Sequence, residues 1–214
     1  MRFARFVFPA ITVAALFLMS GVAAQANSVV LSENFDELTP SLSYLNQVGQ
    51  FTILNGTNVD VVGGAVFGSL CTGPESGNCI DMDGSPGAGI IESAAITFQP
   101  GFTYSLSFDL IGSQRGDTTS TTVTLGSLFD QTFVLASNDD TSGVISNFTF
   151  TVSSATTLNL EFASNDGPFN SEGALLDNVL ITSSPTSNTP EPSSLLLLGT
   201  GLLGCGLLTR RMTQ

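Results

Sequence analysis

Apolar and polar residues alternate along most of the chain between residues 27 and 182. The clearest run is 102–110, where large apolar residues alternate with threonine, serine and aspartate. A period of two places the apolar side chains on one face of a strand, whereas a helix would scatter them. The same alternation at 148–152 and 158–162 predicts two more strands.

Shorter apolar runs bounded by turn residues predict further strands at 29–31, 51–54, 59–62, 90–98, 121–125, 129–135 and 174–181. Asn55-Gly56, Gly63-Gly64 and Pro100-Gly101 are typical turn signals between such runs. Many short strands separated by polar turns favour an all-β domain, a β-sandwich of the jelly-roll type. We place this domain at residues 27–182.

The N-terminus has the pattern of a secretory signal peptide, residues 1–26. Arg2 and Arg5 precede an apolar run at 6–19, and Ala24-Gln25-Ala26 forms a small-x-small cleavage site for signal peptidase. The alternative is an uncleaved membrane anchor. The short run and the position of the small residues favour cleavage and export to an oxidising compartment.

A second apolar segment, 193–208, follows a polar linker at 183–189 and precedes Arg210 and Arg211. This pattern predicts a single membrane helix near the C-terminus, with the arginine pair on the cytoplasmic side. The segment is shorter than the roughly 20 residues that span hydrocarbon comfortably, and local thinning can close that gap. A buried core helix is the alternative, but the segment has no polar outer face.

The tripeptide Pro190-Glu191-Pro192, the apolar segment and the arginines together resemble the PEP-CTERM sorting signal of bacterial exported proteins, here residues 190–214. The resemblance implies recognition by an exosortase, a membrane transpeptidase-like enzyme, in bacteria that make extracellular polysaccharide. It also implies transient membrane anchoring through the C-terminal helix, followed by release to the cell surface or the extracellular space.

Charge narrows the possible partners of the domain. The chain has Lys+Arg 5, Asp+Glu 18 and His 0, and Arg115 is the only basic residue between 27 and 189. An acidic domain is a very poor partner for nucleic acid, whereas calcium is a plausible ligand. Without histidine there is no Ser-His-Asp triad and no His-ligated zinc.

Cys71 and Cys79 lie close together in the domain. In an exported protein such a pair predicts a disulfide, whereas a redox dithiol would favour a Cys-x-x-Cys spacing.

The segment from Asp81 to Glu92 has oxygen-bearing residues at alternate positions, with Asp83 third and Ser85 fifth. This spacing is typical of a calcium loop, although Pro86 stands where an EF-hand has glycine. The alternative is a turn built from short polar residues.

The order of the segments 79–85, 100–110 and 176–179 resembles the galactose-binding-like jelly rolls, especially those of DUF642-like proteins. The resemblance implies carbohydrate binding or a role in assemblies. It also implies a structural calcium held by Asp177 in the last strand, together with Glu33 or Asp36. From the alternation we expect Asp177 to share an apolar face with Leu175, Val179 and Ile181. Capping of backbone amides by Asp177 is the alternative.

These observations favour a non-enzymatic, structural or adhesive protein of the cell surface or extracellular matrix, associated with exopolysaccharide or biofilm. The alternative is a carbohydrate-binding module with structural calcium, for which Tyr44 and Arg115 are candidate ligand contacts. A polysaccharide hydrolase is the third possibility, and it requires two carboxylates at glycosidase spacing in a cleft.

Overall fold

The structure, a computed structural model, describes residues 27–72, 77–85, 87–167 and 170–186. These residues belong to one of two compact units, Gln25–Ser187. The expected signal peptide, the membrane segment and the sorting residues (Pro190, Glu191, Pro192, Arg210 and Arg211) lie outside the described residues. A search of the described residues alone finds no helix long and apolar enough to cross a membrane.

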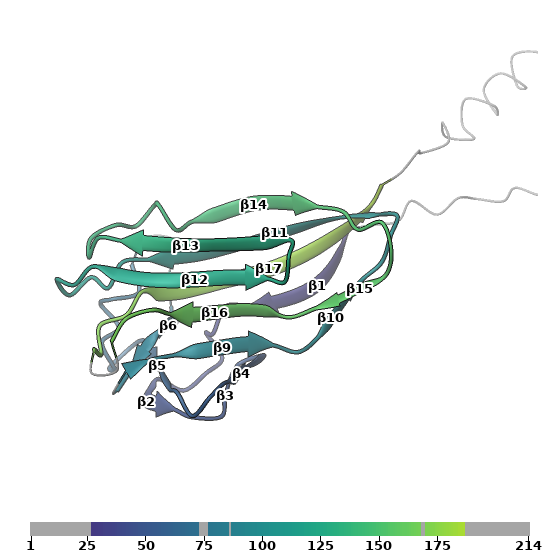
Figure 1. Cartoon of the computed structure of the whole chain (residues 1–214). Helices are drawn as coiled ribbons and strands as arrows, with labels where there is room; N and C mark the ends of the chain where they lie inside the picture. The colour runs from purple at the N-terminus through teal and green to yellow at the C-terminus, as the bar shows by residue number, and fades with distance from the viewer. Residues whose placement is uncertain (1–26, 73–76, 86, 168–169, 187–214) are drawn as a thin grey trace, which may run out of the picture. The chain divides into compact units, whose positions relative to one another are not determined.

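Two antiparallel sheets form the domain (Figure 1). The seven-stranded sheet has the order β14 (Ile145–Phe150), β11 (Phe102–Ile111), β17 (Leu175–Pro185), β6 (Cys79–Asp81), β5 (Val59–Val62) and β2 (Ser41–Tyr44), and β1 (Ser28–Glu33) also pairs with β17. The six-stranded sheet has the order β13 (Phe129–Leu135), β12 (Thr119–Leu125), β16 (Leu160–Ser164), β9 (Ile90–Ser93), β4 (Phe51–Ile53) and β3 (Gln47–Val48). Two small sheets pair β10 (Ile96–Phe98) with β15 (Thr156–Leu158) and β7 (Asp83–Gly84) with β8 (Gly87–Ala88).

The chain passes from one large sheet to the other between β11 and β12, between β13 and β14, and between β16 and β17. Such crossings are typical of a jelly roll. The expected all-β sandwich is therefore confirmed.

Phenylalanine fills the space between the two sheets. The chain has 16 phenylalanines and no tryptophan. The ring of Phe108 meets that of Phe162 edge-on, with centroids 5.3 Å apart, and Phe162 meets Phe51 at 6.0 Å. Edge-to-face pairs of this kind add stability beyond their buried area, and a phenyl ring brings no polar atom that needs a partner.

Two predicted strands are each divided in the structure. The predicted strand 90–98 becomes β9 and β10, and the predicted strand 158–162 is divided between β15 and β16. The points where the two strands are interrupted are hydrogen-bonded to each other. Asn159 Nδ2 donates to the carbonyl oxygen of Ser93 at 2.8 Å, and Leu160 N donates to Ser93 Oγ at 3.0 Å. A period of two continues through such a break, so the alternation cannot show where a strand changes sheet.

The last strand extends beyond the predicted end of the domain at 182. Ser183 in β17 pairs with both Ser28 and Tyr104, and pairing continues to Pro185. The first residues of the expected linker are therefore part of the sheet. Five short strands, β2, β3, β6, β7 and β8, were not predicted, because each has four residues or fewer and shows no sustained alternation.

The two ends of the domain leave it at the same end of the sandwich, since Ser28 and Ser183 are paired (Figure 1). The loops 112–118 and 136–144 and the loop residues 165–167 and 170–174 lie at the opposite end, which we call the tip. Two of these loops are hydrogen-bonded to each other, from Gly112 N to the carbonyl oxygen of Asp139 at 2.7 Å and from Gln114 N to that of Ser137 at 2.8 Å.

Candidate functional site

Buried carboxylates mark two regions of the domain. One surrounds Asp177 beside β1 and β11, and the other lies at the tip around Asp81 and Asp83. All three side chains belong to residues that are at most 1% exposed. Burying a carboxylate is costly unless it is paired, protonated or bound to a cation, so both regions are candidates for function.

A β-bulge in β17 sets the direction of Asp177. Ser107 pairs with Leu180, but Asp109 pairs with Asp177, so β17 has one extra residue here, and Asn178 takes a φ of 53°. The alternation changes phase at a bulge.

The bulge corrects our prediction about the face of Asp177. Leu176, Val179 and Ile181 belong to the main core, whereas Leu175 packs in a second cluster beside the disulfide. Because side chains alternate along a strand, Asp177 lies on the face of Leu175 and not on the face of Val179 and Ile181.

The predicted calcium residues influence one another electrostatically around Asp177. Burial raises the pKa of Asp177 to about 7, although a hydrogen bond from Asn178 N opposes the shift. Neighbouring carboxylates raise this pKa further: Asp36, Asp109 and Glu33. The charges of Glu33 and Asp36, the other two residues of the implied calcium site, thus act on Asp177.

Glu33 ties together two segments of backbone. Its Oε1 accepts a hydrogen bond from Phe35 N at 3.0 Å, and its Oε2 accepts one from Gln50 N at 2.9 Å. Gly49, with a φ of 54°, leaves the space that the carboxylate occupies, because a Cβ there would lie 2.3 Å from Oε2.

Asp36 joins the same region to the disulfide loop. Its Oδ1 accepts from Asn78 N at 2.9 Å, and its Oδ2 accepts from Asn34 Nδ2 at 2.9 Å. The predicted disulfide between Cys71 and Cys79 is present, with the two Cα atoms 5.8 Å apart. Each carboxylate oxygen has two lone pairs, so Glu33 and Asp36 retain acceptor capacity beyond these hydrogen bonds.

A cleft of about 560 Å³ opens beside this acidic region, on the outer face of the seven-stranded sheet. Polar side chains from four segments line it: Glu33, Asn34, Ser107, Asp109, Ser146 and Asn178. Asn178 Nδ2 donates to Asp109 Oδ2 at 2.9 Å, which orients both side chains at the cleft. Carboxylate and amide groups of this kind can hydrogen-bond a polyhydroxylated ligand.

At the tip, Asp81 is held by an ion pair. Its Oδ2 accepts from Arg115 Nη2, and its Oδ1 accepts from Asp83 N at 3.1 Å and from Gly173 N at 2.9 Å. Burial nevertheless raises the pKa of Asp81 to about 7, and the Arg115 guanidinium opposes that shift. Arg115, a candidate ligand contact in the carbohydrate-binding alternative, thus pairs with a buried acid.

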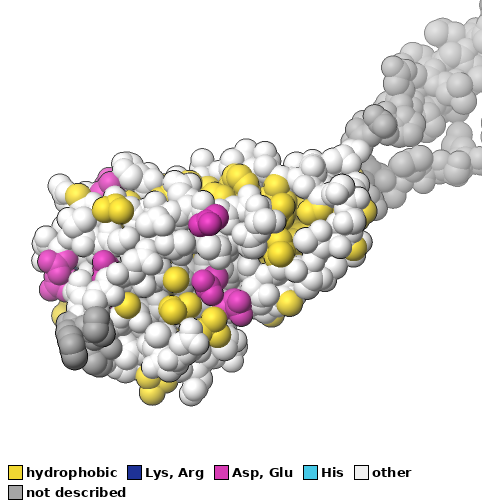
Figure 2. All heavy atoms as spheres, in the orientation of Figure 1, with side chains coloured by type: hydrophobic (Ala, Val, Ile, Leu, Met, Phe, Trp, Pro, Cys, Tyr) yellow, Lys and Arg dark blue, Asp and Glu magenta, His cyan; other side chains and the backbone are white. Residues whose placement is uncertain are grey.

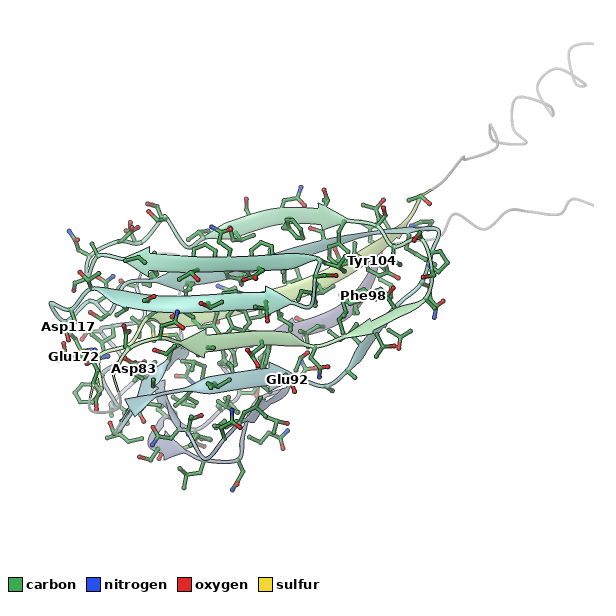
Figure 3. All side chains as sticks on the ribbon, in the orientation of Figure 1. Asp83, Glu92, Phe98, Tyr104, Asp117 and Glu172 are labelled. Atoms are coloured by element: carbon green, nitrogen blue, oxygen red, sulfur yellow. A yellow bond between two sulfur atoms is a disulfide. The ribbon has the colours of Figure 1, made fainter. Side chains whose placement is uncertain are left out.

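Asp83 is as fully buried as Asp81, but it forms no ion pair with a described residue. Neither of its carboxylate oxygens has a hydrogen-bond partner among the described residues. Burial raises its pKa to about 7, the Ser164 side chain opposes the shift, and the Asp166 carboxylate adds to it. Burial also raises the pKa of Asp166. Figure 3 shows Asp83 at the tip, at the same end as Asp117 and Glu172.

The segment expected as a calcium loop folds differently. Asp83 and Gly84 form the small β7–β8 hairpin, and Ser85 Oγ donates to Asp60 Oδ2 at 2.7 Å. Glu92 lies in β9, where it pairs with Glu161 across the six-stranded sheet. Asp81, Ser85 and Glu92 thus have separate partners and do not form one loop site.

The sequence reasoning did not single out several residues of these two regions: Asp109, Asn178, Thr119, Thr121 and Asp166. The polar position of Asp109 opposite the core residues of β11 was visible in the alternation, but its neighbours were not. No group of three or more Asp, Glu or Cys side chains in the described part of the chain has the arrangement of a metal site.

Comparison with solved structures finds similar chains of low identity. The chain is 15% identical to the K3 cleaved adhesin domain of Lys-gingipain from Porphyromonas gingivalis W83 (TM-score 0.38), with 73% of this chain and 99% of that chain covered. It is 15% identical to the CBM22-1 xylan-binding domain of Xyn10C from Paenibacillus barcinonensis (TM-score 0.38; 77% and 100% covered). It is 17% identical to an apo-form cyclase from Fischerella sp. (TM-score 0.44; 76% and 98% covered).

No curated protein sequence matches the chain. Residues 188–211 match the PEP-CTERM protein-sorting motif. The expected sorting signal is therefore confirmed, and it indicates an exported protein with a C-terminal sorting signal.

Proposed function

We propose that this protein is an exosortase substrate that acts, without catalysis, as a structural or adhesive component of the cell surface or extracellular matrix. The observation that carries the proposal is the PEP-CTERM motif at 188–211, which begins just after β17 ends at Pro185. In this proposal, signal peptidase removes residues 1–26 and the C-terminal helix holds the chain in the membrane until the exosortase acts.

The arrangement of the domain supports a role at a surface. Because β17 runs to the end of the sandwich opposite the tip, the tip loops lie at the end farthest from the point where the linker begins (Figure 1). The only basic residue between 27 and 189, Arg115, is paired with Asp81. In the view of Figure 2, acidic side chains are scattered over the visible face and no basic side chain is seen. Such a surface suits association through bridging cations rather than direct binding of anions.

The sorting part is tested by the intact mass of the protein recovered from its host, with and without the exosortase. We expect loss of residues 1–26 and of the C-terminal segment when the exosortase is present, and retention of that segment when it is absent. A mass that keeps the segment in both strains would contradict processing.

The adhesive part is tested by deleting the gene and measuring biofilm mass and surface attachment. Unchanged attachment would count against an adhesive role. Hydrolysis of polysaccharides by the purified protein would contradict the non-enzymatic role.

A carbohydrate-binding module is the second candidate, favoured by the polar cleft on the seven-stranded sheet. Asp109 and Asn178 are its best candidates for hydroxyl recognition, because they are already oriented by their mutual hydrogen bond. Glu33, Asp36 and Asp177 would hold a structural calcium beside it. Both carboxylates raise the pKa of Asp177, and the remaining lone pairs of Glu33 and Asp36 support this proposal.

A glycan array with the purified protein, with calcium and with EDTA, tests this candidate. We expect binding that Asp109→Ala reduces and that Asp130→Ala, an exposed acid on the other sheet, leaves unchanged. Absence of binding to any polysaccharide in calcium would favour the purely structural role.

A further inference from the structure

Oxygen-bearing side chains replace core residues at the tip end of β12 and β16. Thr121 of β12 pairs with Ser164 of β16. Thr119 lies two residues before Thr121, so Thr119, Thr121 and Ser164 share one face of the six-stranded sheet. Asp166 lies two residues after Ser164, in the loop that begins where β16 ends. Toward the middle of the domain the same face of β12 continues with Val123 and Leu125, both in the main core.

Backbone hydrogen bonds hold two of these side chains, those of Ser164 and Asp166. Ser120 N donates to both carboxylate oxygens of Asp166 at 3.2 Å, and Asp166 N donates to Ser164 Oγ at 3.2 Å. Thr119 and Thr121 are fully buried, and neither hydroxyl has a hydrogen-bond partner in the described part of the chain.

Asp83 completes this set from the β7–β8 hairpin. Its side chain lies near Ser164 and Asp166, and it is 0% exposed. Both of its carboxylate oxygens lack a partner among the residues described. We call Asp83, Thr119, Thr121, Ser164 and Asp166 the tip cluster. A fully buried carboxylate with two unpartnered oxygens is rare in a folded protein and calls for a missing partner.

The charges at the tip indicate what kind of ligand would bind the Asp83 oxygens. Arg115 forms its ion pair with Asp81, so neither Asp83 nor Asp166 has an ion pair in the described part of the chain. The Arg115 charge lowers the pKa of Asp83, but burial outweighs it and leaves that pKa raised. Arg115 Nε is also buried without a partner, but as a donor it cannot coordinate a metal. Two carboxylates and several hydroxyl oxygens, with no nitrogen or sulfur ligand, are the groups that a hard divalent cation prefers.

We propose that the tip cluster is a calcium site, distinct from the region around Asp177, with Asp83 and Asp166 as the charged ligands and Thr119 and Thr121 as hydroxyl ligands. The bound ion would join the β7–β8 hairpin to β12 and to the loop that follows β16. It would thereby fix the tip loops in place. This inference does not depend on sorting or on carbohydrate binding.

The test uses the full-length protein in a non-ionic detergent, dialysed first against EDTA and then against metal-free buffer. Calorimetric titration with calcium chloride and native mass spectrometry measure the affinity and the number of bound ions. Asp83→Asn and Asp166→Asn remove one charge each from the tip cluster, and Asp177→Asn is the matched control in the other acidic region. We expect each tip variant to weaken calcium binding at the tip by roughly tenfold or more, and Asp177→Asn to leave one site intact.

Thermal unfolding separates a ligand role from a merely structural one. With EDTA, Asp83→Asn should unfold at the same temperature as the natural protein or higher, because the substitution removes a buried charge that has no ion pair. With calcium, the natural protein should gain stability and Asp83→Asn should not. Thr121→Val keeps every charge and removes one oxygen, and it should weaken binding with no loss of stability in EDTA.

Two results would overturn the proposal. One is the absence of any calcium binding by the natural protein up to millimolar concentrations. The other is binding that Asp83→Asn and Asp166→Asn leave unchanged while Asp177→Asn abolishes it, which would assign the ion to the region beside the cleft.

Discussion

The two ends of the sandwich fill the same kind of interior space with opposite chemistry. At the end near the termini, Phe98 and Tyr104 pack edge-to-face at 4.9 Å, and Phe150 stacks on Tyr104 at 5.4 Å (Figure 3). At the tip, the interior holds Asp81 and Asp83. Aromatic rings are stabilised by any well-packed neighbour, whereas a buried carboxylate needs a specific partner. We therefore expect the stability of the tip to depend on pH and on bound calcium, and that of the aromatic end to depend on neither.

The largest expected effect is in the aromatic core. Phe108→Ala removes a ring that contacts Phe129, Phe133 and Phe162 edge-on. We expect a loss of about 3–5 kcal/mol in the free energy of unfolding, independent of pH and calcium. Chemical denaturation measures the loss, and Val134→Ala, at an exposed position, is the control that should change little. A loss that varied with calcium would weaken the contrast between aromatic packing and the buried acids.

A comparable effect is expected at the tip from Arg115→Met. The substitution leaves Asp81 buried without its ion pair, which should cost about 3–5 kcal/mol near pH 8. The cost should shrink near pH 5, where Asp81 can take up a proton. The double variant Arg115→Met with Asp81→Asn should recover most of the loss, because no charge remains unpaired. Equal costs at both pH values would show that Arg115 acts through packing alone.

The pH dependence of the natural protein in EDTA should follow the buried acids. Folding raises the pKa of Asp81, Asp83 and Asp177 from 3.8 to about 7. Between these values the folded protein holds more protons than the unfolded chain, so stability falls as pH rises from about 4 to about 7. We expect the protein to be more stable near pH 5 than near pH 8 by on the order of a few kcal/mol.

Denaturation curves in EDTA at the two pH values measure this difference. Adding calcium near pH 8 should reduce it, because an ion replaces the protons. Higher stability near pH 8 in EDTA would contradict the assignment of these three acids as the titrating groups.

The smallest effect is expected from the hydroxyl group of Tyr104, the one polar group of the Phe98–Tyr104 pair. Tyr104 Oη accepts a hydrogen bond from Gln99 N at 2.7 Å. Tyr104→Phe keeps the ring and leaves that amide without its partner, so we expect a loss of about 1–2 kcal/mol. Tyr44→Phe, which removes a more exposed hydrogen bond to the carbonyl oxygen of Thr39, is the matched control and should cost less. The unfolding free energies of the two variants measure these costs, and an equal or larger cost for Tyr44→Phe would contradict the prediction.

The sequence predicted long strands well and short ones poorly. The run 102–110 became β11 almost unchanged, because its alternation is sustained and its apolar face is buried throughout. The strands β6 and β7 were missed, because they are two or three residues long and buried on both sides, so no alternation appears. The alternation of apolar and polar residues predicts which side chains are buried, but it does not predict which strands are neighbours in a sheet.

The candidate sites, like the strands, were only partly predictable from the sequence. The sequence supplied Glu33, Asp36 and Asp177 only through a resemblance to a family, and it could not foresee the bulge at Asn178 that turns Asp177 away from the main core. Asp83 was singled out for its spacing to Asp81, yet Asp81 pairs with Arg115, which is 34 residues away in the chain. Asp166 and the threonines of β12 showed no signal at all.

The sequence by itself determined the export and sorting of this protein, its all-β character and its disulfide, because each depends on a local pattern or on a pair of residues close together in the chain. Only the tertiary structure decided which acids are buried and which have partners. Burial and pairing depend on strands that are distant in sequence, and a carboxylate changes its chemistry only when the fold removes it from water.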